Sequence, residues 1–563
     1  MFSTSRTRAQ ESRTAVERLY ITMRHLFIRG GYKPLGLSGE AMIDALKTLS
    51  PEIYGSINDS ERVELDGLFY IFQRLPKGIE ECRFVRLISR EGFERSSFEV
   101  LIPPRRKRNS YRIDQEQMFI EMTRGRSDIY DILTHLTFMY IESEKIRRNS
   151  TDQKGRKNRE WEMLEKVVQQ ENSGEPFNME VALTYLSTLL GRTFQETLEA
   201  ARRFEADGNC NSLFHITYWL GRLSTDEFIE KWDREISFSS ALREKIGHHA
   251  YGDLWAAKIK STIIENGWIK RPIHIVSANL HSFMNALYAH AALKRTVKPI
   301  PLEELAKELS MEDNAHLREK VTHYALRNGM VQLDDTSGTN ISVQLYDLGK
   351  IEPASLHPDI AWNETYIREK QPLLFVMDYA FGEQAYETLD ELFKPLDHEE
   401  GKKYLNVASI NIMGKAGILK GEKGDVMVPT AHVFEGTADN YPIQNAFGKN
   451  DFADSGLGVF EGPMITVLGT SLQNKDILSY FLNSSWKAVG LEMEGAHYQK
   501  AIQAASRIRG NIDRNVVLRY AYYASDNPLE TGSTLASGSL GVEGVKPTYL
   551  ITLKILNDLL REK

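Results

Sequence analysis

The stretch AVGLEMEGAHYQKA, residues 488–501, joins a short apolar run to a pattern typical of an amphipathic helix. Two carboxylates, Glu492 and Glu494, flank Met493 at the junction. In a continuous strand both glutamates would share one face. If the strand instead ends at Glu492, Glu494 lies in the first turn of a helix, where a negative charge is favourable. An ordinary solvated turn would have the same composition, because charged side chains are mostly exposed.

Apolar strand patterns alternate with helical patterns on both sides of this stretch, from residue 371 onward. The strand patterns are QPLLFVMDYA, YLNVASINIM, DVMVPTAHVF, PMITVLGT and NVVLRYAYYA. This alternation predicts an α/β sheet that is covered by helices on both faces. Ligands of such sheets bind beyond the carboxyl ends of the strands. The segments GKAGILKG, EMEG and SDNPL follow strands, so we expect them to converge at one rim.

The N-terminal half has a mainly helical pattern. AVERLYITMRHLFI (15–28) has apolar residues at spacings of three and four, and SSFEVLIPP (96–104) is a short β pattern before a basic cluster at 105–108, which we expect to be a solvated loop. Arg124 and Arg126 precede a predicted helix and would suit a phosphate or carboxylate, although pairing with acids of their own domain is the alternative. We therefore expect three parts: a mainly helical domain over 1–270, a small α/β or connecting region over 271–370, and an α/β domain over 371–563.

Composition restricts the class of protein. The chain has 563 residues, 42% of them hydrophobic, and a formal net charge of −7, which does not favour nucleic-acid binding. It lacks a run of 18 apolar residues and an apolar leader near its first residue, and it has two cysteines. These features predict a cytoplasmic protein without a membrane segment or a disulfide framework. The histidines lack the spacing of metal ligands, so we expect neither a metal nor a cofactor.

Two of the segments that follow strands carry chemistry. Asp526, in Ser525-Asp526-Asn527-Pro528, follows an apolar strand pattern, where desolvation can raise the pKa of a carboxyl group enough to make it a proton donor. The same four residues also suit an ordinary turn. The three glycines of GKAGILKG suit a close approach to a ligand, but their spacing is not that of a dinucleotide or nucleoside triphosphate loop.

The order of these motifs resembles a known superfamily. GKAGIL (414–419) followed by GDVMVP (424–429), EMEG (492–495) and SDNPL (525–529) is similar to the purine nucleoside phosphorylases and nucleosidases. The segment YYASDNPL and the helix pattern ITLKILNDLL after it look most like AMP nucleosidase. The resemblance covers about residues 371–563 and implies a nucleoside-phosphorylase-type domain, a mixed central sheet flanked by helices, after a large mainly helical N-terminal region. It also implies a homo-oligomer.

The resemblance also implies roles for individual residues. Asp526 would protonate the leaving purine at N7, and Glu494 would accept hydrogen bonds from the ribose hydroxyls while Met493 packs against the sugar. Further substrate contacts would come from Gly414, Lys415, Ala416, Gly417 and Ser525. A 5′-phosphate could be held by Lys415, Lys420, His432 or Arg519, which could equally be ordinary surface cations.

The sequence departs from the family at two positions. Lys415 replaces the usual small hydroxyl residue or histidine, and MDYAFGEQAYE lacks the arginine that binds phosphate in phosphorylases. That absence favours water as the attacking group, with Glu383 as a candidate general base, although Glu383 also suits a helix N-terminus. We therefore expect hydrolysis of a purine nucleotide or nucleoside, foremost AMP to adenine and ribose 5-phosphate. The alternatives are a phosphorylase and a nucleotide-sensing protein with a degenerate site.

Overall fold

The computed structural model describes residues 7–152, 154–294, 300–399, 401–437, 439–530 and 540–561. The chain forms two compact units. The first comprises Met1–His248 and Ser471–Ile477, and the second comprises His249–Thr470 and Leu478–Lys563. The boundary after His248 lies earlier than the position near residue 270 that the sequence pattern suggested.

The first unit combines long helices with a six-stranded sheet of order β1-β6-β2-β5-β4-β3. Its helices are α1(Arg8–Arg29), α2(Leu37–Leu49), α3(Leu65–Phe72), α4(Gly125–Ser150), α5(Arg159–Ser173), α6(Met179–Leu190), α7(Phe194–Asp207), α8(Leu213–Ile229) and α9(Ser240–Gly247). Its strands are β1(Gly31–Tyr32), β2(Phe84–Ile88), β3(Val100–Leu101), β4(Ser110–Arg112), β5(Gln117–Glu121) and β6(Glu235–Phe238). The sequence pattern indicated only the strand β3 of this sheet, because strands this short leave little periodicity.

The basic cluster at 105–108 is not a solvated loop throughout. Arg108 is 1% exposed and its guanidinium donates hydrogen bonds to Asp128 and Asp131 of α4. Arg106 donates to both oxygens of Asp131, and Arg124 donates to Asp128. Two buried carboxylates on one helix thus draw in three guanidinium groups, since buried charges require partners. Arg124 was expected either to bind an anionic ligand or to pair with an acid of its own domain, and the structure shows the second.

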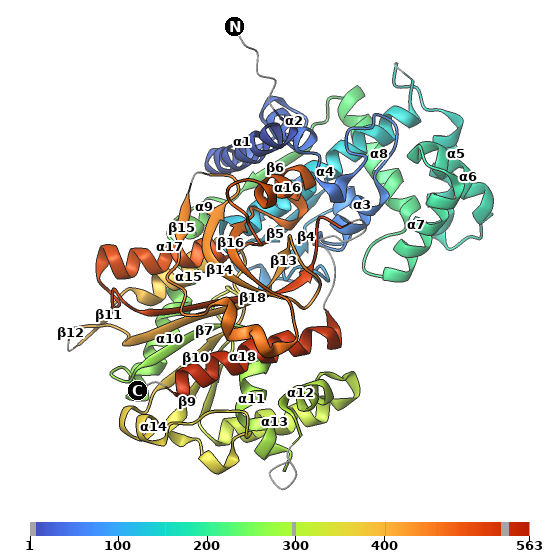
Figure 1. Ribbon diagram of the computed structural model, residues 1–563. Coiled ribbons are helices and arrows are strands. Elements are labelled where there is room, and N and C mark those ends of the chain that lie inside the picture. The colour runs from blue at the N-terminus through green and yellow to red at the C-terminus, as the bar shows by residue number, and fades with distance from the viewer. Residues whose placement is uncertain are drawn as a thin grey trace. The chain divides into compact units, whose positions relative to one another are not determined.

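The second unit is built on a ten-stranded mixed sheet (Figure 1). Its strands are β7(Ile273–Ser277), β8(Met330–Leu333), β9(Val343–Asp347), β10(Leu373–Met377), β13(Val407–Ile418), β14(Val426–Phe434), β15(Asn440–Pro442), β16(Val459–Thr466), β17(Gly490–Glu492) and β18(Val517–Asp526). The two-stranded hairpin β11(Leu396–His398) and β12(Gly401–Lys403) stands apart from this sheet. Residues 271–370, expected to be a separate small or connecting region, contribute β7, β8 and β9 to the sheet that β10 continues.

Five strands of this sheet close into a ring. β13 pairs with β18, β18 with β14, β14 with β16, β16 with β17, and β17 again with β13. The closure depends on Gly490, where an added Cβ would lie 2.4 Å from the Met427 sulfur and 2.7 Å from the Gly417 carbonyl oxygen. The ring brings the ends of β13, β17 and β18 together, and these strands carry the three segments singled out in the sequence.

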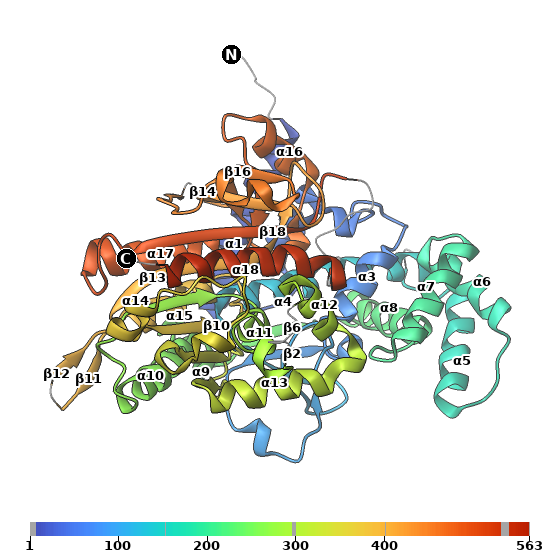
Figure 2. The same cartoon turned by 60° about the horizontal axis from the view of Figure 1, so that its bottom comes forward.

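Helices cover both faces of the sheet, as the alternation of strands and helices predicts. They are α10(Ala250–Glu265), α11(Leu280–Ala292), α12(Leu302–Ser310), α13(Ala315–Arg327), α14(Glu364–Lys370), α15(Gln384–Phe393), α17(Gly495–Gln503) and α18(Val545–Leu560), while α16(Lys475–Asn483) begins in the segment assigned to the first unit. Along β10, Leu373, Phe375 and Met377 pack in one apolar cluster with α10, α15 and α17. Leu374 and Val376 pack in the other cluster, with α11 and α18. The ribbons of β10, α11 and α18 are labelled in the turned view (Figure 2).

Among the described residues, no helix has the length and apolar character that crossing a bilayer requires.

Candidate functional site

The chain breaks from strand to helix at Glu492. β17 ends at this residue and α17 starts at Gly495. The buried Glu492 carboxylate accepts hydrogen bonds from the backbone N–H groups of Glu494, at 2.5 Å, and Gly495, and from the Thr466 hydroxyl at 2.5 Å. Burial raises its pKa to about 7. Glu492 therefore supplies partners for the free N–H groups that begin α17, and the two glutamates have separate positions.

Glu494 is half-buried and is the N-cap residue of α17. One carboxylate oxygen, Oε1, accepts a hydrogen bond of 2.9 Å from the N–H of Gly382. Gly382 has a φ of +55° just after β10, a conformation that glycine adopts without strain. Burial, and then the neighbouring Glu492 carboxylate, raise the pKa of Glu494 to about 8. A carboxyl group in this range changes charge near neutral pH.

The glycines of GKAGI suggested a loop. The structure instead places this segment at the end of the long strand β13. It remains extended because it pairs with β18 on one side and, at Gly417 and Ile418, with β17 on the other. Lys415 is the one exposed residue of β13, and no hydrogen bond or ion pair joins its ammonium to another described residue. Its charge acts on both Glu494 and Asp526, lowering their pKa values against the effect of burial. Lys415 therefore stands within electrostatic reach of both acids.

Asp526 is the last residue of β18 and is fully buried. Its Oδ1 accepts a hydrogen bond of 2.5 Å from the Ser525 hydroxyl, whereas Oδ2 has no hydrogen-bond partner among the described residues. Burial raises its pKa, and the Ser525 hydroxyl and the ammonium groups of Lys415 and Lys423 oppose that effect. A buried carboxylate oxygen without a partner favours the protonated form, so the site suits a proton donor.

A cavity of about 240 Å³ lies where these strands meet. Glu492, Met493 and Glu494 line it on one side and Ser525 on another, with Gly414 to Gly417 between them. Its remaining lining residues are Ser277, Tyr379, Ala380, Ile412, Met413, Val467, Thr470, Leu491, Tyr498 and Tyr522. The cavity is thus mostly apolar with a few polar groups, as is typical of small-molecule sites. Parts of the three segments singled out in the sequence, residues 414–417, residues 492–494 and Ser525, therefore line one cavity.

A second cavity of about 350 Å³ shares Lys415 with the first. Its lining is more polar and includes Asn279, His281 and Arg318. The Arg318 guanidinium already donates to the backbone oxygens of Leu309 and Met311, so Lys415 is the cation with its donors free. A ligand that fills the first cavity and passes the Lys415 side chain would enter the second.

Residues predicted from the sequence that lie outside the lining of the first cavity include Asp526, whose neighbour Ser525 does line it, and His432, Arg519 and Glu383. His432 is fully buried, and its Nε2 lies 3.2 Å from the Tyr522 hydroxyl; burial lowers its pKa to about 3. Arg519 is 6% exposed and its guanidinium donates to Asp558 and Asn411. Neither side chain is available to a phosphate, because each strand places it in the interior. Glu383 follows Gly382, the residue that holds Glu494, but it does not line the cavity.

Three tyrosines that line the cavity were missed by the sequence reasoning. Tyr379 lies two residues after the end of β10, and Tyr498 lies one helical turn after Glu494 with its hydroxyl 2.8 Å from the Ser277 hydroxyl. Tyr522 lies three residues before Ser525 on β18, and the irregular pairing between Ala524 and Asp526 breaks the alternation, so that Tyr522 and Ser525 both line the cavity. The positions of these tyrosines relative to the predicted site were visible in the sequence. They were not singled out because aromatic residues in apolar strands are ordinarily core residues.

Solved structures similar to this chain are nucleosidases and futalosine hydrolases. A 5′-methylthioadenosine/S-adenosylhomocysteine nucleosidase of Campylobacter jejuni is 10% identical, with 52% of this chain and 100% of that chain covered and a TM-score of 0.31. A futalosine hydrolase mutant of Helicobacter pylori is 13% identical, with 52% and 99% covered and a TM-score of 0.29. A nucleosidase mutant of Helicobacter pylori with 5′-methylthioadenosine in its active site is 14% identical, with 52% and 99% covered and a TM-score of 0.31.

No curated protein matches the sequence. A family profile does match, over residues 40–298 and 304–561, and so includes most of both units together with every residue of the first cavity. The chain belongs to this family, which is described as a family of unknown function, DUF6909.

Proposed function

We propose that the protein hydrolyses the N-glycosidic bond of a purine nucleotide or nucleoside, foremost AMP, to give the free base and ribose 5-phosphate. The observation that supports this most directly is a pair of carboxyl groups in different surroundings: Glu494 lines the first cavity, and Asp526 is buried next to the lining residue Ser525. Glu494 has a carboxylate oxygen bound to a backbone N–H, and Asp526 has a buried oxygen with no partner among the described residues. Two carboxyl groups in different surroundings can take different roles.

Asp526 suits the role of the general acid that protonates the leaving base. When the bond between C1′ and the purine nitrogen breaks, the base leaves with the bonding electron pair and needs a proton. A protonated Asp526 donates that proton at N7 of the base, which lowers the energy of the departing group in the transition state. The Ser525 hydroxyl, bound to the other carboxylate oxygen, fixes the orientation of the donor.

Glu494 suits the role of the carboxylate that binds the ribose and stabilises its developing positive charge. As the bond breaks, positive charge develops at C1′ and the ring oxygen, and a nearby carboxylate stabilises it. The 2′- and 3′-hydroxyls of the ribose would donate hydrogen bonds to Glu494, whose Oε1 is already oriented by Gly382. Met493, on the same wall of the cavity, provides an apolar surface for the sugar.

Lys415 supports an anionic 5′ substituent. Its ammonium lines both cavities and has no hydrogen bond or ion pair to another described residue. A nucleoside whose base and ribose occupied the smaller cavity would direct its 5′ carbon toward Lys415 and the larger, more polar cavity. A phosphate there would form charge-assisted hydrogen bonds. This favours a nucleotide over a neutral nucleoside.

Water, rather than inorganic phosphate, suits this site as the attacking group. Among the described residues that line the first cavity, Lys415 is the one cation. An inorganic phosphate would then compete with a 5′-phosphate for the same ammonium, whereas a water molecule requires no cation. Hydrolysis adds the hydroxide part of water to C1′, and its second proton is released to a base or to solvent.

A substrate panel tests the proposal. Purified protein is incubated with AMP, IMP, adenosine, inosine and methylthioadenosine, with and without inorganic phosphate, and free base and sugar products are measured. We expect adenine and ribose 5-phosphate from AMP regardless of phosphate. Ribose 1-phosphate formed only with phosphate would establish the phosphorylase alternative, and tight AMP binding without base release would establish the sensor alternative.

The variant Lys415→Met separates nucleotide from nucleoside. Loss of a charge-assisted contact costs about 1.5–3 kcal/mol, so kcat/KM for AMP should fall by at least about tenfold. The value for adenosine should fall less than that for AMP, because adenosine has no 5′ charge and loses only the effect of the Lys415 charge on Glu494 and Asp526. Equal losses for both substrates would contradict the role of Lys415 at the 5′ position.

A further inference from the structure

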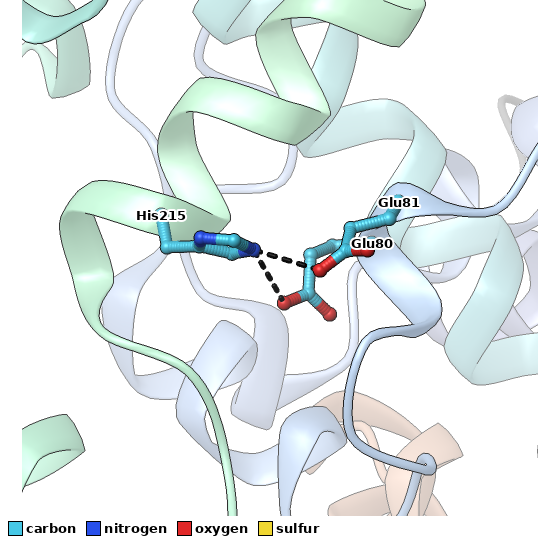
Figure 3. Close-up of side chains that lie close together, drawn as sticks. All are labelled: Glu80, Glu81 and His215. Carbon is cyan, nitrogen blue, oxygen red and sulfur yellow. Dashed lines mark hydrogen bonds and ion pairs between the residues drawn. The ribbon is translucent and has the colours of Figure 1, made fainter. Parts of the chain in front are cut away.

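A cluster of one imidazole and two carboxylates lies in the first unit, apart from the residues of both cavities. Glu80 and Glu81 end the short 3-10 helix η2(Ile79–Glu81), and His215 lies in the first turn of α8. The His215 Nε2 is 2.8 Å from an oxygen of Glu81 and 3.9 Å from an oxygen of Glu80 (Figure 3). All three ligand atoms lie within 4.8 Å of one another.

Glu80 is the member of the cluster that needs explanation. It is 1% exposed, and its contacts are the Asn211 amide at 2.6 Å and the more distant His215 ring. No lysine or arginine among the described residues forms an ion pair with it. Buried carboxylates in proteins are paired with cations, are protonated or bind metals, because an isolated charge is costly away from water. Here one imidazole is shared between two carboxylates, of which the buried one has the weaker contact.

The spacing of the three atoms suits a metal ion. Ligands about 2.0–2.2 Å from an ion are about 3–3.5 Å apart in octahedral or tetrahedral geometry. Two of the three separations, 2.8 and 3.9 Å from His215 Nε2, lie on either side of that range, and all three atoms lie within 4.8 Å of one another. Small movements of the side chains would therefore suffice, without a change in the backbone.

The neighbouring residues hold these ligands in position. Arg112 donates to the other oxygen of Glu81 at 2.8 Å and to the Gly78 carbonyl oxygen at 2.8 Å, so it fixes η2 while leaving one Glu81 oxygen toward His215. Gly78 has a φ of +83°, and an added Cβ would lie 2.9 Å from the Arg112 guanidinium. Fixed outer contacts of this kind are typical of metal sites.

We propose that Glu80, Glu81 and His215 form a binding site for one divalent first-row metal ion, of the range from Mn²⁺ to Zn²⁺. One nitrogen and two carboxylate oxygens are ligands that these ions accept, and two carboxylates against one guanidinium leave a net negative charge for a cation. The ion would join η2 to α8, segments separated by more than a hundred residues in sequence, and would therefore stabilise the first unit.

The same residue types occur in a second cluster, which serves as a comparison. His249, Asp390 and Glu391 lie in the second unit, but Lys394 binds Glu391 at 2.6 Å and Arg509 binds Asp390 at 2.6 Å. Each carboxylate there already has its own cation. We therefore expect no ion at the second cluster, and His249→Ala is the matched control for His215→Ala.

The test is metal binding by the full chain. Protein freed of metals with a chelator is titrated calorimetrically with Mn²⁺, Co²⁺ and Zn²⁺ in separate experiments. We expect one equivalent to bind and the melting temperature to rise with ion concentration, since an ion that binds the folded state stabilises it. His215→Ala and Glu80→Gln should each weaken binding by at least tenfold, whereas His249→Ala should not. Absence of binding, or equal binding by all variants, would overturn the proposal.

A measurement on the unaltered protein applies even if those variants do not fold. Crystals soaked in Co²⁺ or Zn²⁺ are examined by anomalous scattering at the absorption edge of the metal. A peak within bonding distance of His215 Nε2 and both glutamates supports the site. A peak elsewhere, or no peak at occupancies that label other sites, contradicts it and leaves the cluster as an ion pair.

Discussion

At the residue scale, Asp526 and Glu494 differ in the partners that the backbone gives them. Asp526 has one oxygen bound by Ser525 and another with no partner among the described residues, whereas Glu494 receives a backbone N–H. Lys415 is within electrostatic reach of both. For a proton donor and an anionic acceptor to act together, Asp526 must hold its proton while Glu494 is ionised, and burial opposes that ionisation by raising the pKa of Glu494 to about 8.

The proton of Asp526 is tested by Asp526→Asn. The amide preserves the shape of the side chain but cannot transfer a proton, so kcat for base release should fall by about 10²–10⁴-fold, the usual contribution of a general acid. Steady-state release of adenine measures this, with exposed Asp454→Asn as the control for loss of a carboxylate elsewhere. Turnover close to that of the unaltered protein would show that the acid is another group.

The ionisation of Glu494 predicts a pH dependence. Its pKa is raised to about 8, and the ribose contact requires the carboxylate, so kcat/KM should rise as the pH increases toward about 8, and ionisation of Asp526, which must be protonated, gives the falling limb. In Glu494→Gln the rising part of the profile should disappear together with most of the activity. A profile that stays flat from pH 6 to 9 in the unaltered protein would contradict an ionised Glu494 in the free enzyme.

At the element scale, the start of α17 depends on Glu492. This carboxylate accepts from two backbone N–H groups and from Thr466, whose oxygen in turn accepts from the N–H of Ala496. The first turn of α17 is thereby fixed by a residue of the preceding strand. The position of Glu494, which lies between these N–H groups, follows from the same contacts.

Removal of this cap should be costly. Glu492→Ala leaves buried N–H groups without partners, and the loss of a helix cap costs about 0.5–2 kcal/mol. We expect a lower melting temperature and a higher KM, because Glu494 loses its support. Glu492→Gln, which retains one acceptor oxygen, should be milder on both measures. Unchanged stability in the alanine variant would show that water replaces the carboxylate.

The order of the elements after residue 371 and the extent of β13 differ in how far the sequence predicts them. The order of strands and helices after residue 371 was predictable, because apolar strands and amphipathic helices have distinct periods. The extension of β13 through GKAGI was not, because glycine is depleted in strands and the two pairings that hold it come from segments far along the chain. The junction at Glu492 was readable, since an acid that ends an apolar strand is a local signal.

Other site features depend on long-range contacts. His432 and Arg519 have the chemistry of phosphate ligands, yet their strands place them in the interior, and sequence alone does not give the face of a strand within a closed ring. The cluster of Glu80, Glu81 and His215 was invisible in the sequence because its ligands are separated by more than a hundred residues. Spacing rules detect metal sites only where the ligands are close along the chain.

At the scale of the whole molecule, His274 and His432 are the buried histidines of the second unit with the largest lowering of the pKa among the described residues. His274 contacts the hydroxyls of Ser409 and Tyr366, and His432 contacts that of Tyr522. Burial lowers the pKa of each to about 3, from an ordinary value of 6.5. Between about pH 6.5 and 3, these two histidines therefore bind protons in the unfolded chain but remain neutral in the folded unit.

This difference predicts acid sensitivity. Because the unfolded histidines bind protons first, their contribution to stability is present above about pH 6.5 and is lost as the pH falls toward 3, by about 1.4 kcal/mol per pKa unit of difference for each group. Denaturant unfolding between pH 8 and pH 4 measures the slope. His432→Gln should make it shallower, whereas exposed His281→Gln should not. Equal slopes for all three proteins would contradict a neutral buried His432.

The closed ring of strands has a consequence for synthesis on the ribosome. β13 begins at residue 407, but its partner β18 ends only at residue 526, and β18 also joins β14 to the ring. A nascent chain that has released β13, β14 and β16 therefore has strand edges without partners until about the last tenth of the sequence emerges. Such edges favour association with other chains. Before that point the second unit is a species for chaperones to protect, and a stop codon before residue 526 should yield aggregate instead of a weakened enzyme.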